Sequence, residues 1–338
     1  MNAVEVNQRA KFLSHAIDYS LLRIVRRYAK KYPMHEPDYI SLLVQEFVPH
    51  FSYMLNHAFS EYQFTVSGIF CHQSPIVSMR TATPMKHPEL GDILFVYAET
   101  DDISDKTYYN SLLLQAKMSK NPIKKVPRYD AHQLYLYQNW PEFVYITPSH
   151  LKNKIIDVQP KEINDGAQYL LINPNSFKGN ECICSLSTQF IMGCAVPAQP
   201  LVVDKSLSWE LIDFIKFKSG RMFEADPINT RDDWTKMIWD LIYVGANIYN
   251  RNNINHANQH RGVYCSTHNF SQTDIGKKIM SITEKWNNGE RFDFINSSNQ
   301  QDCGVSVVII ECKKRRPDQR PDVIKDDSNP CGDSSIGE

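Results

Sequence analysis

The sequence predicts an α/β protein in which helices cover a central sheet. Three observations lead to this expectation. Apolar residues recur at helical spacing in two long segments near the N-terminus. Short runs rich in Val, Ile, Phe and Leu follow, and turn-forming residues bound them. A helical stretch then separates two of these runs, which is typical of a crossover between strands of one sheet.

The first two elements are expected to be helices. The first covers residues 10–31 and carries four cations near its end, where positive charge suits a helix C-terminus. Pro33 is expected to end it. The second is expected to run from about residue 38 to residue 62, with an interruption or restart at Pro49.

Four strands and one helix are expected next. The strands are predicted at residues 64–79, 92–97, 111–118 and 143–146, and the helix at 133–140. Leu112, Leu113 and Leu114 form an unbroken apolar run, which indicates a strand covered on both faces. The resulting order is helix, three strands, helix, strand.

The remaining chain is expected to add helices at 206–218, 231–249 and 272–286 and a strand at 305–310. From Lys313 the chain is polar and contains several Pro, Asp and Ser residues, so a disordered tail is expected. The expected organisation is an N-terminal helix (1–34), a core (35–160), a mainly helical accessory region that also contains strands (161–312) and the tail (313–338).

Composition excludes several classes of protein. The formal net charge is -1 and the sequence pI is about 6.8, so a polyanion site must be a local patch. Eight cysteines lack the paired spacing of a zinc ribbon or a disulfide framework. No secretory signal and no apolar run of roughly 18 residues is found, so we expect a reduced, cytoplasmic protein without a membrane partner.

Asp92, Gln115 and Lys117 form the candidate catalytic site. Residues two apart on a strand project from the same face, so Gln115 and Lys117 are expected to lie together. Asp92 opens the neighbouring strand and can share a cation with the Gln115 amide oxygen. Mg²⁺, or alternatively Mn²⁺, prefers such oxygen ligands. A lysine beside the cation suits phosphodiester hydrolysis.

This arrangement resembles the PD-(D/E)xK nuclease superfamily, the restriction-endonuclease-like fold. The resemblance rests on Gly91-Asp92 and on Gln115-Ala116-Lys117, with Gln in place of the usual acid, and covers roughly residues 38–148. Gln133 and Tyr137 match the Gln-x-x-x-Tyr element of the RecB-like branch. The resemblance implies that both residues support the site or contact nucleic acid.

Gln115 removes one negative charge from the expected metal site. Three outcomes are open: Gln115 acts as a neutral ligand, another acid replaces it, or catalysis has been lost. Glu61 and Glu89 are the candidate replacement acids. His72 and Gln73, on the preceding strand, are expected to face the site.

Two other patterns compete with this assignment. Glu311-Cys312-Lys313 ends an apolar strand and matches the acidic-x-Lys consensus better, although only a polar tail follows it. Four further side chains are of zinc-ligand type, in a loop rich in Asn: His256, His260, Cys265 and His268.

The leading expectation is a metal-dependent nuclease that acts on DNA, with a prokaryotic defence effector as its setting. The cations between Lys117 and Arg128 are expected to contact phosphates or to be solvated. A regulatory protein or a second copy of the chain is the other partner considered. The alternative is a catalytically silent nuclease-fold module that binds nucleic acid or a protein. A third possibility is an unrelated α/β protein.

Overall fold

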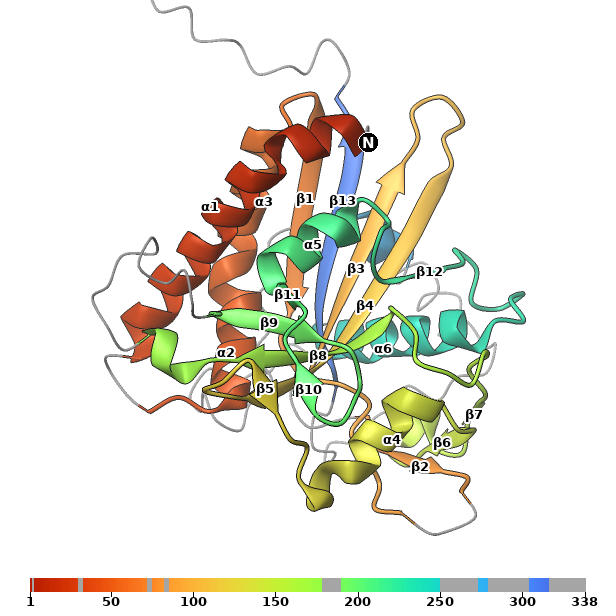
Figure 1. Cartoon of the computed structure of the whole chain (residues 1–338). Helices are drawn as coiled ribbons and strands as arrows, with labels where there is room; N and C mark the ends of the chain where they lie inside the picture. The colour runs from red at the N-terminus through yellow and green to blue at the C-terminus, as the bar shows by residue number, and fades with distance from the viewer. Residues whose placement is uncertain are drawn as a thin grey trace, which may run out of the picture.

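A computed structural model of the chain describes residues 1, 3–29, 33–71, 75–81, 85–177, 190–249, 273–278 and 304–315. They form a mixed α/β fold with a central sheet and helices on both of its faces (Figure 1). The fold class expected from the sequence is therefore confirmed at this level.

The central sheet is mixed in direction. β13 is parallel to β3, and β8 is parallel to β4, whereas the other neighbouring strands are antiparallel. Its path is β1 (Tyr62–Ile69), β13 (Ser306–Lys314), β3 (Ile93–Thr100), β4 (Thr107–Met118), β8 (Ala167–Ile172), β9 (Met192–Ala195) and β11 (Lys205–Ser206), and β12 (Arg221–Phe223) also pairs with β4.

The helices begin and end where local chemistry allows. Ser206 accepts a hydrogen bond from the Trp209 amide and caps the start of α5. Pro49 lies in the first turn of α3, where a missing amide proton costs no helical hydrogen bond. The helices are α1 (Ala3–Ala29), α2 (Glu36–Leu42), α3 (Val48–Ala58), α4 (Ala131–Asn139), α5 (Leu207–Ile215) and α6 (Asp233–Tyr249), and a π-helical turn (Leu43–Phe47) joins α2 to α3.

The sheet separates two hydrophobic clusters. On β3, Ile93, Phe95 and Tyr97 pack with α1, α2, α3 and α5, whereas Leu94 and Val96 pack with α4 and α6. All five side chains are fully buried. Both faces of β3 are therefore covered, as the unbroken apolar runs predict.

Two expected strands were placed wrongly. The segment expected as one strand over 64–79 is split into β1 and a separate short strand. The strand expected at 143–146 forms, but it lies outside the central sheet; β8 takes the place beside β4. A small sheet consists of β2 (Val77–Met79), β6 (Phe143–Tyr145) and β7 (Ile155–Ile156). Apolar content predicts a strand but does not say which sheet it joins.

β13 lies between β1 and β3, although more than two hundred residues separate it from them in sequence. The strand continues to Lys314, so the disordered tail expected from residue 313 does not begin there, and residues 316–338 lie outside the described part of the chain. Strands from both sides of residue 160 share the sheet. The expected boundary at 160 therefore does not separate two sheets.

Among the described residues, no helix has both the length and the apolar character that crossing a bilayer requires.

Candidate active site where β3 begins and β4 ends

β4 continues four residues beyond its last pairing with β3, because Ile93 pairs with Leu114 while β4 ends at Met118. Two carboxylates occupy the edge that this overhang leaves open. The Asp92 carboxylate accepts a hydrogen bond from the Ala116 amide at 2.7 Å. The Glu36 carboxylate accepts one from the Met118 amide, also at 2.7 Å. The overhang therefore brings two acids to the end of β4.

Gln115 and Lys117 project from the same face of β4, as their spacing predicts. This is the face of Leu113, which packs toward α4. The Gln115 side-chain amide donates a hydrogen bond to the Asp92 carboxylate, and the Lys117 ammonium lies 3.3 Å from an Asp130 carboxylate oxygen. Asp92, Gln115 and Lys117 are thus brought together, with Asp130 beside them.

The Gln115 amide oxygen (Oε1) is buried and has no hydrogen-bond partner among the described residues. The Gln115 side chain is only 3% exposed, so it has little access to water. An unpaired buried acceptor is unfavourable by roughly 1–3 kcal/mol. A group that donates a hydrogen bond to this oxygen, or a cation that the oxygen coordinates, would relieve that cost.

The pKa of Asp92 is raised to about 7, mainly by burial and also by the carboxylates of Glu89 and Glu36, while the Ala116 amide and Lys117 act to lower it. Asp92 therefore titrates near neutral pH. A bound cation would favour its ionised form. Glu89, one of the two candidate replacement acids, is close enough to affect Asp92, as is Glu36.

α4 presents Gln133 and Tyr137 to the same side of the sheet. The Tyr137 hydroxyl donates a hydrogen bond to the Leu90 carbonyl at 2.8 Å, and its ring stacks on Trp140 with the centroids 5.6 Å apart. The Gln133 side-chain oxygen is buried without a partner in the described part of the chain. Tyr137 therefore fixes the segment that leads to Asp92, while Gln133 keeps a free acceptor.

Tyr169 adds a third buried polar atom without a partner among the described residues, its hydroxyl. Its Cα pairs with that of Gln115 across β4 and β8. The carboxylates of Asp130 and Asp92, after burial, raise the pKa of Tyr169, which places this hydroxyl near both acids. Sequence reasoning missed Tyr169, because strand register is needed to find it.

The structure does not bring every expected residue to this site. Glu61 precedes β1 at the end where Tyr62 pairs with Lys314, whereas Asp92 lies at the end where Ile93 pairs with Ser306. Glu61 is therefore at the opposite end of the sheet and does not replace the missing acid. His72 and Gln73 lie outside the described residues.

Glu36 and Asp130 are the acids that the sequence interpretation missed. Glu36 begins α2 directly before Pro37, and acid followed by proline is typical of a helix start. That signal locates a helix end, but only the tertiary structure places it beside Met118. Asp130 ends the 3-10 helix Arg128–Asp130, and nothing in the local sequence points to Lys117 as its partner.

Glu311 and Lys313 have other partners. The Glu311 carboxylate accepts the backbone amides of Asp274 and Ile275 at 3.0 and 2.8 Å, and Lys313 pairs with the Asp274 carboxylate. Glu311 thereby caps the helical turn at 274–278. The competing zinc candidates His256, His260, Cys265 and His268 lie outside the described residues.

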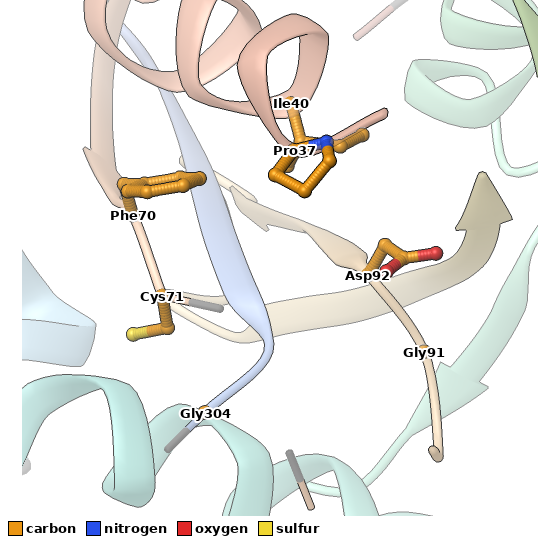
Figure 2. Close-up of a pocket in the computed structure, with 7 residues that line it drawn as sticks. All are labelled: Pro37, Ile40, Phe70, Cys71, Gly91, Asp92 and Gly304. Carbon is orange, nitrogen blue, oxygen red and sulfur yellow. The ribbon is translucent and has the colours of Figure 1, made fainter. Parts of the chain in front are cut away.

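A small pocket opens beside Asp92, on the side of α2 (Figure 2). Figure 2 shows Phe70 and Cys71 across the pocket from Asp92, with Pro37 and Ile40 above. Apolar side chains and the glycines Gly91 and Gly304 make up the rest of its lining. The pocket therefore keeps one side of the Asp92 carboxylate away from other charges.

No group of three or more His, Cys, Asp or Glu side chains with metal-binding geometry occurs in the described part of the chain. The end of β4 instead combines one carboxylate and one amide oxygen, which can coordinate a cation, with the ammonium of Lys117 nearby. Comparisons with family models, with curated proteins and with solved structures found no match.

Proposed function

We propose that the chain is a metal-dependent nuclease that hydrolyses phosphodiester bonds, with DNA as its substrate. The observation that carries the proposal is the buried Gln115 oxygen, which has no partner among the described residues; its side chain is hydrogen-bonded to Asp92 and shares a face of β4 with Lys117. An oxygen pair beside a lysine suits a divalent cation and a phosphate group.

The order of elements supports the proposal. β3 and β4 are antiparallel, α4 follows them, and β8 then pairs parallel to β4. The PD-(D/E)xK resemblance implies a helix, three strands, a helix and a strand; here β6 and β7 of the small sheet come between α4 and β8, and β8 rather than β6 lies beside β4. The insertion of β13 between β1 and β3 is a departure from the uninterrupted order of three strands that the sequence predicted.

Asp92 and Gln115 would hold Mg²⁺ or Mn²⁺, since a carboxylate and an amide oxygen are ligands that these ions accept. When bound, the ion would neutralise phosphate charge and acidify a water molecule. To act as a ligand, Gln115 must present its oxygen rather than its amide nitrogen to the cation. A rotation of the side-chain amide exchanges the two, and the present hydrogen bond to Asp92 would then be replaced.

Lys117 contributes a positive charge at the phosphate. In the free protein its ammonium pairs with Asp130, which orients it, and its side chain is only 13% exposed. An incoming phosphate competes with Asp130 for that ammonium. Asp130 is therefore expected to hold Lys117 in place before the substrate binds.

A cleavage assay tests the proposal. Purified protein is incubated with plasmid DNA and with RNA in Mg²⁺ or Mn²⁺, beside Asp92→Ala and Lys117→Ala. We expect both substitutions to abolish cleavage. Tyr53→Ala, on α3, is the control and should leave it unchanged. Cleavage that survives both site substitutions would refute this assignment.

A catalytically silent nucleic-acid-binding module is the second candidate. Asp92 is already bonded to Gln115 and Ala116, and Lys117 is already paired with Asp130, so the polar groups largely satisfy one another. This reading predicts nucleic-acid binding that Mg²⁺ does not change and no cleavage under any metal. A gel-shift assay run beside the cleavage assay separates the two candidates.

A further inference from the structure

The segment between the end of β4 and α4 carries a concentration of positive charge. Residues 118–129 contain four cations and no acidic residue: Lys120, Lys124, Lys125 and Arg128. None of the four takes part in an ion pair among the described residues, whereas Lys154, Lys205 and Lys216 each have a carboxylate partner. Unpaired clustered cations produce a local positive potential on a chain whose net charge is close to zero.

This basic segment is anchored. The side-chain amide of Gln199 accepts from the Val126 amide at 2.8 Å and donates to the Val126 carbonyl at 2.9 Å. β5 (Ile123–Lys124) pairs with β10 (Leu201–Val202), and the chain then leads to α4 (Figure 1). A ligand would therefore meet a surface that is already ordered, which lowers the entropic cost of binding.

The basic segment also exposes a flat aromatic ring. Tyr129 is 71% exposed, and Ile123 is 56% exposed on β5. A solvated, cation-rich surface gains nothing from these apolar groups. A nucleic-acid strand explains both features, because its phosphates meet the cations and its bases stack on the ring.

Both ends of the segment lie at the candidate active site. It starts directly after Lys117, and Tyr129 is followed by Asp130, the ion-pair partner of Lys117. Lys86 and Lys117 add positive charge beside His132 on α4, since both lower the His132 pKa after burial does. A strand lying on the segment would thus be led to Lys117.

We propose that residues 120–129 bind a single strand of nucleic acid and direct it to the Asp92, Gln115 and Lys117 site. The inference rests on the proposed nuclease function and specifies its substrate as single-stranded. The bases of a duplex are stacked on one another and cannot offer a free face to Tyr129, whereas those of a single strand can. The chemistry is shared by single-stranded DNA and RNA.

Binding is measured without cleavage, by fluorescence anisotropy in EDTA. The probes are labelled single-stranded DNA and RNA oligonucleotides of about 12 nucleotides, the size range that one strand-binding surface covers, and a duplex of the same sequence. We expect the single strands to bind at least tenfold more tightly than the duplex. Equal or tighter duplex binding would overturn the proposal.

The cations are tested by Lys124→Gln with Lys125→Gln and Arg128→Gln. Their loss should weaken single-strand binding at least tenfold and reduce the salt dependence, since each lost phosphate contact lowers the logarithmic slope by about 0.7. The control combines Lys11→Gln, Arg23→Gln and Lys152→Gln, which removes the same charge from other exposed positions. Equal effects of the two triple variants would show non-specific charge attraction and overturn the proposal.

The ring is tested by Tyr129→Ala and Tyr129→Phe. We expect Tyr129→Ala to weaken single-strand binding about tenfold and Tyr129→Phe to restore it, because stacking needs the ring and not the hydroxyl. Tyr53→Ala is the matched control, since Tyr53 is also 71% exposed. Unchanged binding in Tyr129→Ala would contradict the stacking role, and preferential binding of an acidic protein such as a poly-glutamate probe would refute a nucleic-acid surface.

The two proposals fail in different ways. If Lys117→Ala abolishes cleavage while the triple Gln variant binds and cleaves normally, the nuclease proposal is supported and single-strand binding by residues 120–129 is refuted. If the wild type never cleaves but binds single strands through this segment, the binding proposal is supported and the nuclease proposal is refuted.

Discussion

Two motifs that end in lysine place their outer side chains on the same face of the sheet but at opposite ends of it. Gln115-Ala116-Lys117 ends β4 beside Asp92, and Glu311-Cys312-Lys313 lies near the end of β13, about 20 Å further along the strand direction at 3.3 Å per residue. The β13 motif has the consensus acid, and the β4 motif has Gln in its place. As isolated sequences, the β13 motif is the better match.

Their hydrogen bonds reverse that ranking. Both Glu311 oxygens accept backbone amides, and Lys313 pairs with Asp274, so the β13 motif is used to hold a helical turn. The β4 motif keeps the Gln115 oxygen unpartnered among the described residues and gathers Asp92, Glu36 and Asp130 around it. If β4 carries the proposed site, agreement with a consensus is a weaker guide to a site than the groups that the fold leaves available.

The largest expected effect is a difference in cleavage rate between alanine variants of the two motif lysines. Lys117→Ala should reduce the cleavage rate by about 10³-fold, because it removes a preorganised charge from the phosphate. Lys313→Ala should change the rate by less than about twofold, because Lys313 is expected to contribute little to transition-state stabilisation. Single-turnover cleavage of a labelled substrate measures both. Losses of cleavage rate of similar size in the two variants would contradict the assignment of the site to β4.

The next effect is on stability at β13. Glu311→Ala should lower the free energy of unfolding by about 2–3 kcal/mol, since the amides of Asp274 and Ile275 lose their acceptor. Lys313→Ala removes only an exposed ion pair and should lower it by less than about 1 kcal/mol. Urea denaturation followed by circular dichroism measures both. Cleavage in Glu311→Ala, assayed well below its unfolding midpoint, should be unaffected.

A substitution of Asp92, beside β4, is expected to raise the free energy of unfolding, in a pH-dependent way, whereas Glu311→Ala lowers it. Its pKa is raised from 3.8 to about 7, so the folded protein holds this proton more tightly than the unfolded chain does. The stability that protonated Asp92 contributes is fully present below pH 4 and is lost as the pH rises to about 7. Asp92→Asn should remove that loss and be more stable by about 2 kcal/mol at pH 8, allowing for partial solvent screening. Unfolding free energies at several pH values would diverge above pH 4; parallel curves would contradict the raised pKa.

The smallest expected effect sharpens the role of Gln115. Gln115→Glu supplies the missing carboxylate and should tighten Mn²⁺ binding about tenfold, because charge strengthens coordination of hard cations. Gln63→Glu, at an exposed position of β1, is the matched control and should bind as the wild type does. Calorimetric titration measures the affinities. An unchanged affinity in Gln115→Glu would remove Gln115 from the metal site.

Local sequence was sufficient for most elements and for part of the site. The helices α1, α4, α5 and α6 and the strands β3 and β4 form within a few residues of their expected ranges, apart from an earlier start of α1 and of β4. Strand period placed Gln115 and Lys117 on one face, because that relation depends only on neighbouring residues. The contact between Asp92 and Gln115 needed the register of two strands, which an apolar run leaves open.

Long-range contacts account for the errors. Glu36 reaches Met118 through the packing of α2, and the Glu61 carboxylate lies at the wrong end of a strand whose direction the sequence does not specify. β13 shows the same limitation on a larger scale. Its apolar run predicts burial on both faces but not its neighbours.

The position of β13 has a consequence for how the chain acquires its structure. β1 and β3 are made early in synthesis, yet their partner edges stay open until residues 306–314 emerge. Contacts across so long a stretch of chain slow folding, and open strand edges favour association between copies. Newly made protein is therefore expected to aggregate until β13 is in place, and shortening the chain before residue 306 should yield aggregates.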